Sequence, residues 1–278
     1  MADLIVGICR FSFLGRGDWA IYSGTGHGSE AEAEARRKVA ETLYQPERLE
    51  QRFRSFEALT LASIKAQRHP DFHFIVLTSP AMPQVYRARL ERLCAADGRI
   101  HLLVSDQPTV NEALAPLLAQ ISEGGRHRLV QFRLDDDDCL GIEYTAALHR
   151  AAEAGRQYDV FAFSMPRGLL VSNYAGAEPA RYEIDRPFHS AGAAVRPRSP
   201  AQTIYSFGHY ALMRRFPCLL DPRFLGSLQL KLEGHDSRPE VPRRGNGLRV
   251  LEQPVFAENL ARAFPFVALS QLETLLLA

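Results

Sequence analysis

Four consecutive aspartates, residues 135–138, stand in the segment RLVQFRLDDDDCLGIEY. Neighbouring carboxylates about 6 Å apart repel each other by roughly 3 kcal/mol at an effective dielectric constant of about 20. Such a cluster must be solvated, partly protonated or neutralised by a cation. Mg²⁺ and Mn²⁺ prefer carboxylate oxygens, and Mg²⁺ commonly takes one or two of them together with phosphate oxygens of a ligand. The run therefore indicates either a solvated acidic loop or a site for a metal and a phosphate.

The aspartates follow a short apolar segment that predicts a buried strand. Over the first 155 residues, such segments alternate with amphipathic ones, and two of the latter open with capping-box spacing. The predicted strands are residues 4–9, 72–79, 100–105 and 127–134, and the predicted helices are residues 29–44, a segment from Pro46, 83–96, 109–124 and 141–154. This alternation predicts an α/β fold, a mostly parallel sheet flanked by helices.

Parallel strands bring their carboxyl ends to one edge of a sheet, where ligands bind. The glycine- and arginine-rich residues 12–18 follow the first strand, Ser79 ends the second, and the aspartates end the fourth. Alternation along the chain places Asp135 and Asp137 on one side and turns Asp138 towards the loop, which leaves Asp136 as a spacer. The alternative is an acidic loop that only caps the next helix.

Composition narrows the class of protein. The chain has 278 residues, of which 46% are hydrophobic and 23% charged, and its net charge is +1. This profile is typical of a soluble globular protein, and we expect no nucleic-acid partner. No apolar run approaches the ~20 residues of a membrane span, and no basic leader precedes the first strand. We therefore expect no integral membrane segment and a cytoplasmic location. The four cysteines form no C-x-x-C pair, which argues against a cysteine-based zinc site.

Beyond residue 157 the pattern becomes less regular. YDVFAFS and GLLVSNY predict two strands, which we interpret as a hairpin, and a proline- and arginine-rich stretch follows. We expect residues 158–278 to form a smaller α+β region of the same domain as residues 1–157.

One enzymatic interpretation of the aspartates is a phosphatase of the haloacid dehalogenase type. These enzymes carry a D-x-D motif at the end of a strand and use its first aspartate as the nucleophile. Their motif normally follows the first strand, whereas this run follows the fourth. LDDDDCLG also lacks the usual threonine or valine after the second aspartate, so this interpretation stays an alternative.

Four stretches together resemble the A-type glycosyltransferases, and within them the bacterial rhamnosyltransferase family. They are CRFSFLG, PERLEQRFRSFEALTLASIKAQRHPDFHFIVLTSPAMP, FRLDDDDCL and LKLEGHDS. The second stretch matches the family's long arginine-rich helix with its L-x-S-x-x-x-Q end and the strand after it, and the third matches its D-x-D block. The resemblance spans most of residues 9–140 and extends more weakly to about residue 240.

The resemblance implies transfer of a sugar from a nucleoside diphosphate sugar, with Mn²⁺ or Mg²⁺ bridging the diphosphate. It implies that Asp137 and Asp138 face the metal and makes His235 a candidate for a third ligand, the alternative being a surface or loop histidine. The residues that it places near the donor are Arg10, Ser12, Arg16, Ser79 and, beside the ribose, Asp135. Arg52 and Arg54 are candidates for phosphate contacts or for solvated ion pairs. Residues 1–157 would then bind the donor, and residues 158–278 would face the acceptor, a glycan or another hydroxyl compound.

The chain also departs from the A-type pattern. Many of these enzymes hold the base with an aspartate at the end of the second strand, where this chain has Leu77-Thr78-Ser79. UDP and dTDP donors therefore both remain open, and a non-catalytic nucleotide- or sugar-binding protein is a second alternative. No residue selects rhamnose.

An inverting enzyme needs a base for the acceptor hydroxyl. Asp185, Asp221 and Asp236 lie in the C-terminal third. We favour Asp221, because LLDPRF predicts that a helix starts there; the alternative is that Asp221 only caps this helix.

Overall fold

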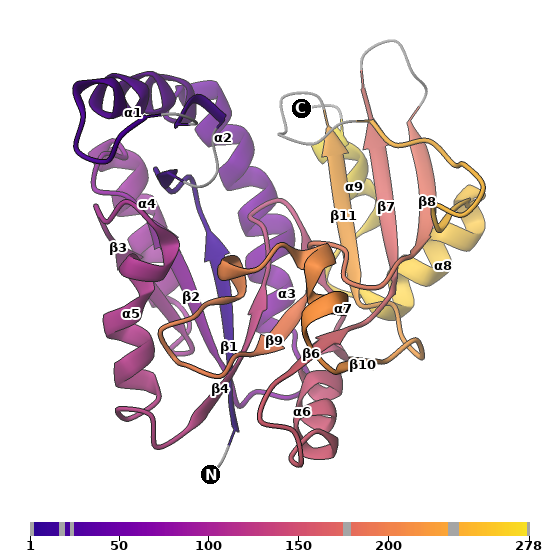
Figure 1. The fold of residues 1–278 in the computed structure, drawn as a ribbon. Helices are drawn as coiled ribbons and strands as arrows, with labels where there is room; N and C mark the ends of the chain where they lie inside the picture. The colour runs from indigo at the N-terminus through magenta and orange to yellow at the C-terminus, as the bar shows by residue number, and fades with distance from the viewer. Residues whose placement is uncertain (1–2, 17–19, 23–24, 175–178, 233–238, 277–278) are drawn as a thin grey trace.

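The computed structural model of the protein describes residues 3–16, 20–22, 25–174, 179–232 and 239–276. Its larger sheet has the strand order β10-β6-β9-β4-β1-β2-β3 (Figure 1). The strands run parallel to their neighbours, apart from β9, which is antiparallel to β4 and β6. The predicted mostly parallel sheet is thus confirmed. Its strands are β1 (Asp3–Arg10), β2 (His73–Thr78), β3 (Ile100–Val104), β4 (Arg128–Arg133), β6 (Phe161–Ser164), β9 (Ala194–Arg196) and β10 (Cys218–Leu220).

Helices cover both faces of this sheet and bury apolar side chains against it. On one face, α4 (Gln84–Ala95), α6 (Tyr144–Ala154) and the helix that starts at Pro46 share a core with the strands. On the other face, α5 (Val110–Ile121) and α7 (Leu212–Arg215) do the same. The α/β layering that the sequence predicts is therefore present.

The two predicted capping boxes mark the starts of α1 (Glu30–Leu43) and α5. The Ser29 hydroxyl accepts a hydrogen bond from the backbone N–H of Glu32 at 3.1 Å, and the Thr109 hydroxyl accepts one from Glu112 at 3.2 Å. Each hydroxyl satisfies a backbone donor that the first turn of a helix leaves without an intrahelical partner. These short-range signals were sufficient to place both helix starts.

The helix that starts at Pro46 is one continuous element made of three segments. It runs as α2 (Pro46–Ser55), widens into a π-helical segment (Phe56–Leu61) and ends as α3 (Ala62–Lys65). We call this continuous element the α2–α3 helix. The rings of Phe53 and Phe56 lie 4.7 and 4.8 Å from the ring of Phe11, just beyond the end of β1. This packing fixes the helix above the carboxyl edge of the sheet.

A smaller sheet with the order β12-β8-β7-β11-β5 stands beside the larger one (Figure 1). Its core forms between the strands and two C-terminal helices, α8 (Gln253–Ala263) and α9 (Leu269–Leu276). Its strands are β5 (Cys139–Leu140), β7 (Arg167–Asn173), β8 (Ala180–Asp185), β11 (Ser227–Leu232) and β12 (Leu248–Val250).

Two local predictions for the C-terminal part are wrong. The predicted hairpin does not form, because β6 joins the larger sheet while β7 pairs with β8 and β11 in the smaller one. The residues from Asp221 to Gly226 form a loop rather than a helix.

The two halves of the chain also interleave. Strands β6, β9 and β10 follow residue 158 yet complete the larger sheet, whereas β5 precedes it and joins the smaller sheet. A boundary at residues 157/158 therefore does not separate the sheets. Within the described ranges, no helix has both the length and the apolar character needed to cross a bilayer.

Candidate functional site

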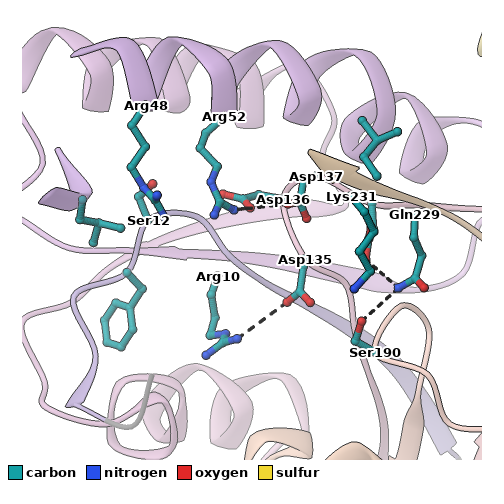
Figure 2. A pocket seen from close by; sticks show the side chains of 14 residues that line it. Arg10, Ser12, Arg48, Arg52, Asp135, Asp136, Asp137, Ser190, Gln229 and Lys231 are labelled. Atoms are coloured by element: carbon teal, nitrogen blue, oxygen red, sulfur yellow. Dashed lines mark hydrogen bonds and ion pairs between the residues drawn. The ribbon is translucent and has the colours of Figure 1, made fainter. Parts of the chain in front are cut away.

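The carboxyl ends of β1 and β4 lie next to each other and open into a pocket of about 370 Å³ (Figure 2). The pocket is bounded by the loop after β1, the α2–α3 helix, the four aspartates of residues 135–138, which we call the aspartate loop, and β11 of the smaller sheet. The lining residues are Arg10, Ser12, Phe13, Leu43, Arg48, Arg52, Asp135, Asp136, Asp137, Asp138, Ser190, Gln229, Leu230 and Lys231.

Asp135 is held by two arginines from the neighbouring strands. Its two carboxylate oxygens each lie 3.0 Å from Nη2 of Arg133, and Oδ1 lies 3.8 Å from Nη2 of Arg10. Both guanidinium groups also lie over the ring of Tyr205, whose hydroxyl donates to the carbonyl of Ile8 at 3.1 Å. Burial alone would raise the pKa of Asp135, but the charges of Arg133 and Arg10 outweigh it and lower the pKa below its usual value. Asp135 is therefore an anionic hydrogen-bond acceptor at neutral pH.

Asp136 faces the pocket and is not the spacer that alternation predicted. Its side chain is 2% exposed and forms an ion pair with Arg52 of the α2–α3 helix. Nη1 of Arg52 also lies 3.7 Å from Oδ2 of Asp137. Burial raises the pKa of Asp136 to about 6, even though Arg52 acts against it. The loop does not continue the strand, because a backbone hydrogen bond from Asp138 to Asp135 at 3.3 Å turns the chain.

Asp138 lies on the side of the pocket nearest β11. Its Oδ2 accepts a hydrogen bond from the Gln229 side chain at 3.3 Å, and its backbone carbonyl accepts one from the Thr60 hydroxyl at 2.8 Å. Burial, followed by the negative charges of Asp137 and Asp135, raises the pKa of Asp138 well above its usual range. Figure 2 shows Lys231 and Gln229 reaching towards the aspartate loop from the side opposite Ser12 and Arg48.

In the loop after β1, Ser12 is the predicted donor contact whose surroundings are suited to binding a ligand. It lines the pocket and adopts a φ of 47°, a left-handed conformation that is unusual for a residue with a side chain. Its hydroxyl oxygen is buried and has no hydrogen-bond partner in the described part of the chain. Strained backbone often occurs at functional sites, and a buried hydroxyl without a partner is suited to a bound polar group.

Two other predicted donor contacts, Arg16 and Ser79, are not among the pocket-lining residues. Arg16 forms an ion pair with Glu32 at 2.8 Å, and the Ser79 hydroxyl accepts a hydrogen bond from the backbone N–H of Leu14 at 2.8 Å. These contacts hold the loop after β1 in place. Direct contact of either side chain with a donor therefore stays a prediction without support from the geometry.

The predicted base, Asp221, also lies outside the pocket lining. Its carboxylate oxygens accept hydrogen bonds of 2.9 and 2.7 Å from the Arg223 guanidinium, and the Arg223 hydrogen bonds lower the pKa of Asp221. His235, the predicted third metal ligand, and Asp236 fall outside the described residues. Asp185 ends β8 and is exposed.

Several functional candidates were missed from the sequence. Arg48 precedes Arg52 by one helical turn, so its position facing the pocket could have been found from the i, i+4 spacing. Gln229 and Lys231 share one face of β11 by alternation, but their approach to the aspartates depends on pairing between distant strands. No motif or spacing in the sequence identifies Ser190 as a pocket residue.

The carboxylate oxygens of the aspartate loop are suited to a divalent cation that also binds a phosphate group of a ligand. Asp137 and Asp138 are the hard oxygen ligands that Mg²⁺ and Mn²⁺ take. Oδ2 of Asp136 is buried without a hydrogen-bond partner in the described chain. No group of three or more His, Cys, Asp or Glu side chains in the described ranges is arranged to hold a metal.

Over residues 4–244, the chain matches the model of a family described as "Putative rhamnosyl transferase". The protein therefore belongs to this family of glycosyltransferases, as the resemblance of its motifs implied, and its fold is GT-A-like. No curated protein matches the chain significantly.

Similar solved structures are distant. S. aureus TarS (residues 1–349) is 9% identical with a TM-score of 0.39, and the match covers 83% of this chain and 60% of that one. A "putative nucleotide-diphospho-sugar transferase" from Desulfovibrio desulfuricans G20 is 9% identical with a TM-score of 0.39, covering 99% and 97%. A 4-diphosphocytidyl-2C-methyl-D-erythritol synthase is 15% identical with a TM-score of 0.39, covering 81% and 91%. The chain thus spans less than two thirds of the TarS fragment.

Proposed function

We propose that this protein is a metal-dependent glycosyltransferase that moves a sugar from a nucleoside diphosphate sugar to a hydroxyl acceptor. The supporting observation is that one pocket combines cationic side chains with carboxylates. Arg48, Arg52 and Lys231 face a volume that Asp137 and Asp138 also line. A diphosphate requires cationic donors, whereas a divalent cation requires carboxylates. A nucleoside diphosphate with its metal satisfies both sets at once.

The chain's own residues would divide the work as follows. Asp137 and Asp138 hold Mn²⁺ or Mg²⁺, which supplies Lewis-acid stabilisation of the leaving diphosphate when bound. Arg48 and Arg52 orient the diphosphate through planar N–H donors, and Lys231 adds a positive charge from the β11 side. Asp135, kept ionised by Arg133 and Arg10, accepts hydrogen bonds from the donor ribose, and the Ser12 hydroxyl contacts the donor at the opposite end of the pocket.

We propose a glycan or another hydroxyl compound as the acceptor, an inverting reaction, a role in polysaccharide synthesis and a cytoplasmic location. Asp221 remains our prediction for the base, but its carboxylate would have to leave Arg223 to reach an acceptor hydroxyl. UDP and dTDP sugars both remain candidate donors, with rhamnose among the sugars.

The proposal is tested by nucleotide binding in thermal-shift and calorimetric titrations. We expect UDP or dTDP to stabilise the protein in the presence of Mn²⁺ and to do so much less with EDTA, because the diphosphate and the metal are bound together. Asp137→Asn should weaken metal-dependent nucleotide binding at least about tenfold, equivalent to about 1.4 kcal/mol. The matched control is Asp71→Asn, an exposed aspartate before β2 at the opposite end of the sheet, which should bind as the unmodified protein does.

The two alternative functions, a phosphatase and a non-catalytic binding protein, predict different assay results. A phosphatase would release phosphate from an aryl phosphate with Mg²⁺ alone and would not require a nucleotide. A non-catalytic binding protein would show the nucleotide shift but no hydrolysis or transfer of a nucleotide sugar. Unchanged nucleotide affinity in the presence of EDTA, or in the Asp137→Asn variant, would contradict the metal role.

A further inference from the structure

The α2–α3 helix places a cation against the carboxylates that we assign to the metal side of the pocket. Nη1 of Arg52 contacts the Asp136 carboxylate and lies 3.7 Å from Oδ2 of Asp137 (Figure 2). The Arg52 side chain is 12% exposed and the Asp137 side chain 15%. This interaction therefore occurs in a largely dehydrated place, where charges act more strongly on each other than in water.

The other charges of the aspartate loop are arranged differently. Asp135 has two arginines of its own, Arg133 and Arg10. Asp138 receives a neutral amide hydrogen bond from Gln229. Arg52 thus places a positive charge at the middle of the loop, and a divalent cation approaching Asp137 meets that charge.

From this arrangement, and resting on the proposed function, we infer that Arg52 is a built-in counter-cation that couples metal binding to diphosphate binding. Without a diphosphate, Arg52 neutralises Asp136 and Asp137 and weakens their hold on a metal ion. A diphosphate in the same pocket offers Arg52 a bidentate partner, which releases the carboxylates to the metal. Because coupling between two sites is reciprocal, the metal also strengthens diphosphate binding by the same factor.

The experiment measures Mn²⁺ binding by electron paramagnetic resonance, with and without UDP or dTDP, at equal free Mn²⁺. For the unmodified protein we expect the nucleotide to tighten Mn²⁺ binding at least about tenfold, within the range typical of coupled sites. Arg52→Gln should bind Mn²⁺ alone at least about fivefold more tightly, and the enhancement by nucleotide should fall by a similar factor. Arg54→Gln is the matched control, because Arg54, the other predicted phosphate contact, is exposed on the same helix and is not among the pocket-lining residues; this variant should behave like the unmodified protein.

A second pair of variants covers the case in which Arg52→Gln does not fold because Asp136 loses its partner. Here Asp136→Asn is compared with the double variant Asp136→Asn/Arg52→Gln, and the double variant should bind Mn²⁺ alone more tightly. Equal Mn²⁺ affinity within each pair would overturn the inference.

The Mn²⁺-only measurements also separate this inference from the proposed function. If no nucleotide binds but removal of Arg52 still tightens Mn²⁺ binding, the counter-cation role stands and the transferase proposal fails. If nucleotide binding is metal-dependent but removal of Arg52 leaves Mn²⁺ affinity unchanged, the counter-cation role fails and the transferase proposal stands.

Discussion

Adjacent carboxylates in the aspartate loop differ in pKa according to which cations the fold brings to them. Asp135 keeps a low pKa although it is buried, because two guanidinium groups from β1 and β4 face it. The pKa of Asp136 rises to about 6 with one guanidinium partner. The same balance of burial against partners acts on His189, which is 3% exposed and lies next to the pocket residue Ser190. Burial lowers the pKa of His189 to about 4, despite its contact with the carbonyl of Met165 at 3.2 Å.

His189 should make the protein sensitive to mild acid. Its folded-state pKa lies below the unfolded value of 6.5, so the folded state binds the proton more weakly. The stability that depends on neutral His189 is therefore complete above pH 6.5 and is lost as the pH falls towards 4. From pH 7 to pH 5, this group should lower the free energy of unfolding by about 2 kcal/mol.

Urea unfolding at the two pH values checks this. His189→Gln keeps a side-chain amide donor for Met165 and should lose that part of the pH dependence. His27→Gln, which changes an exposed histidine, should retain it. Identical pH dependence in His189→Gln and the unmodified protein would contradict the assignment.

At the scale of elements, the π-helical segment explains how one helix can hold the aspartate loop at two points. Ser55 and Thr60 are five residues apart, which in a regular α-helix turns them about 140° away from each other. The wider π-helical turn, in which residues i and i+5 are bonded, brings both to the same side. The Thr60 hydroxyl donates to the carbonyl of Asp138 at 2.8 Å. The Ser55 hydroxyl lies 3.4 Å from the carbonyl oxygen of Asp136, although the carbonyl of Arg52 is a nearer acceptor at 3.1 Å.

Thr60→Val tests this attachment, since it keeps the shape of the side chain and removes the hydroxyl. We expect the free energy of unfolding to fall by about 1–2 kcal/mol, because the buried carbonyl of Asp138 loses a donor. We also expect weaker metal-dependent nucleotide binding, because the loop is less firmly positioned. Chemical denaturation and nucleotide titration measure the two effects. Thr60→Ser keeps the hydroxyl and should lose less stability than Thr60→Val, whereas the reverse order would show that the methyl group matters more.

At the scale of the whole molecule, the parts that could be predicted from sequence are those that local chemistry decides. The apolar run of β1 and the hydroxyls of Ser29 and Thr109 were sufficient because a buried strand and a capped helix start depend on nearby residues. The pairing of β6 and β7 with different sheets could not be predicted, since periodicity reports which side of a strand is buried but not its partner. For the same reason Lys231 was missed, and the residues from Asp221 form a loop although Asp221 has the signature of a helix start.

Interleaving of the two halves predicts that residues 1–157 do not fold alone. β4 is a central strand, and β9, from the second half, covers its outer edge. Gln131 of β4 is fully buried, and its amide accepts a hydrogen bond from Ile204 N–H and donates one to the carbonyl of Gln202, both at 3.0 Å. Without these partners, β4 would expose an unpaired apolar edge and a polar group that lost its bonds.

We expect residues 1–157 expressed alone to aggregate or to unfold without a cooperative transition, and co-expression with residues 158–278 to restore a soluble complex. Size-exclusion chromatography and urea unfolding followed by circular dichroism measure this, and a monomeric fragment with one sharp transition would show instead that the first half is an independent domain.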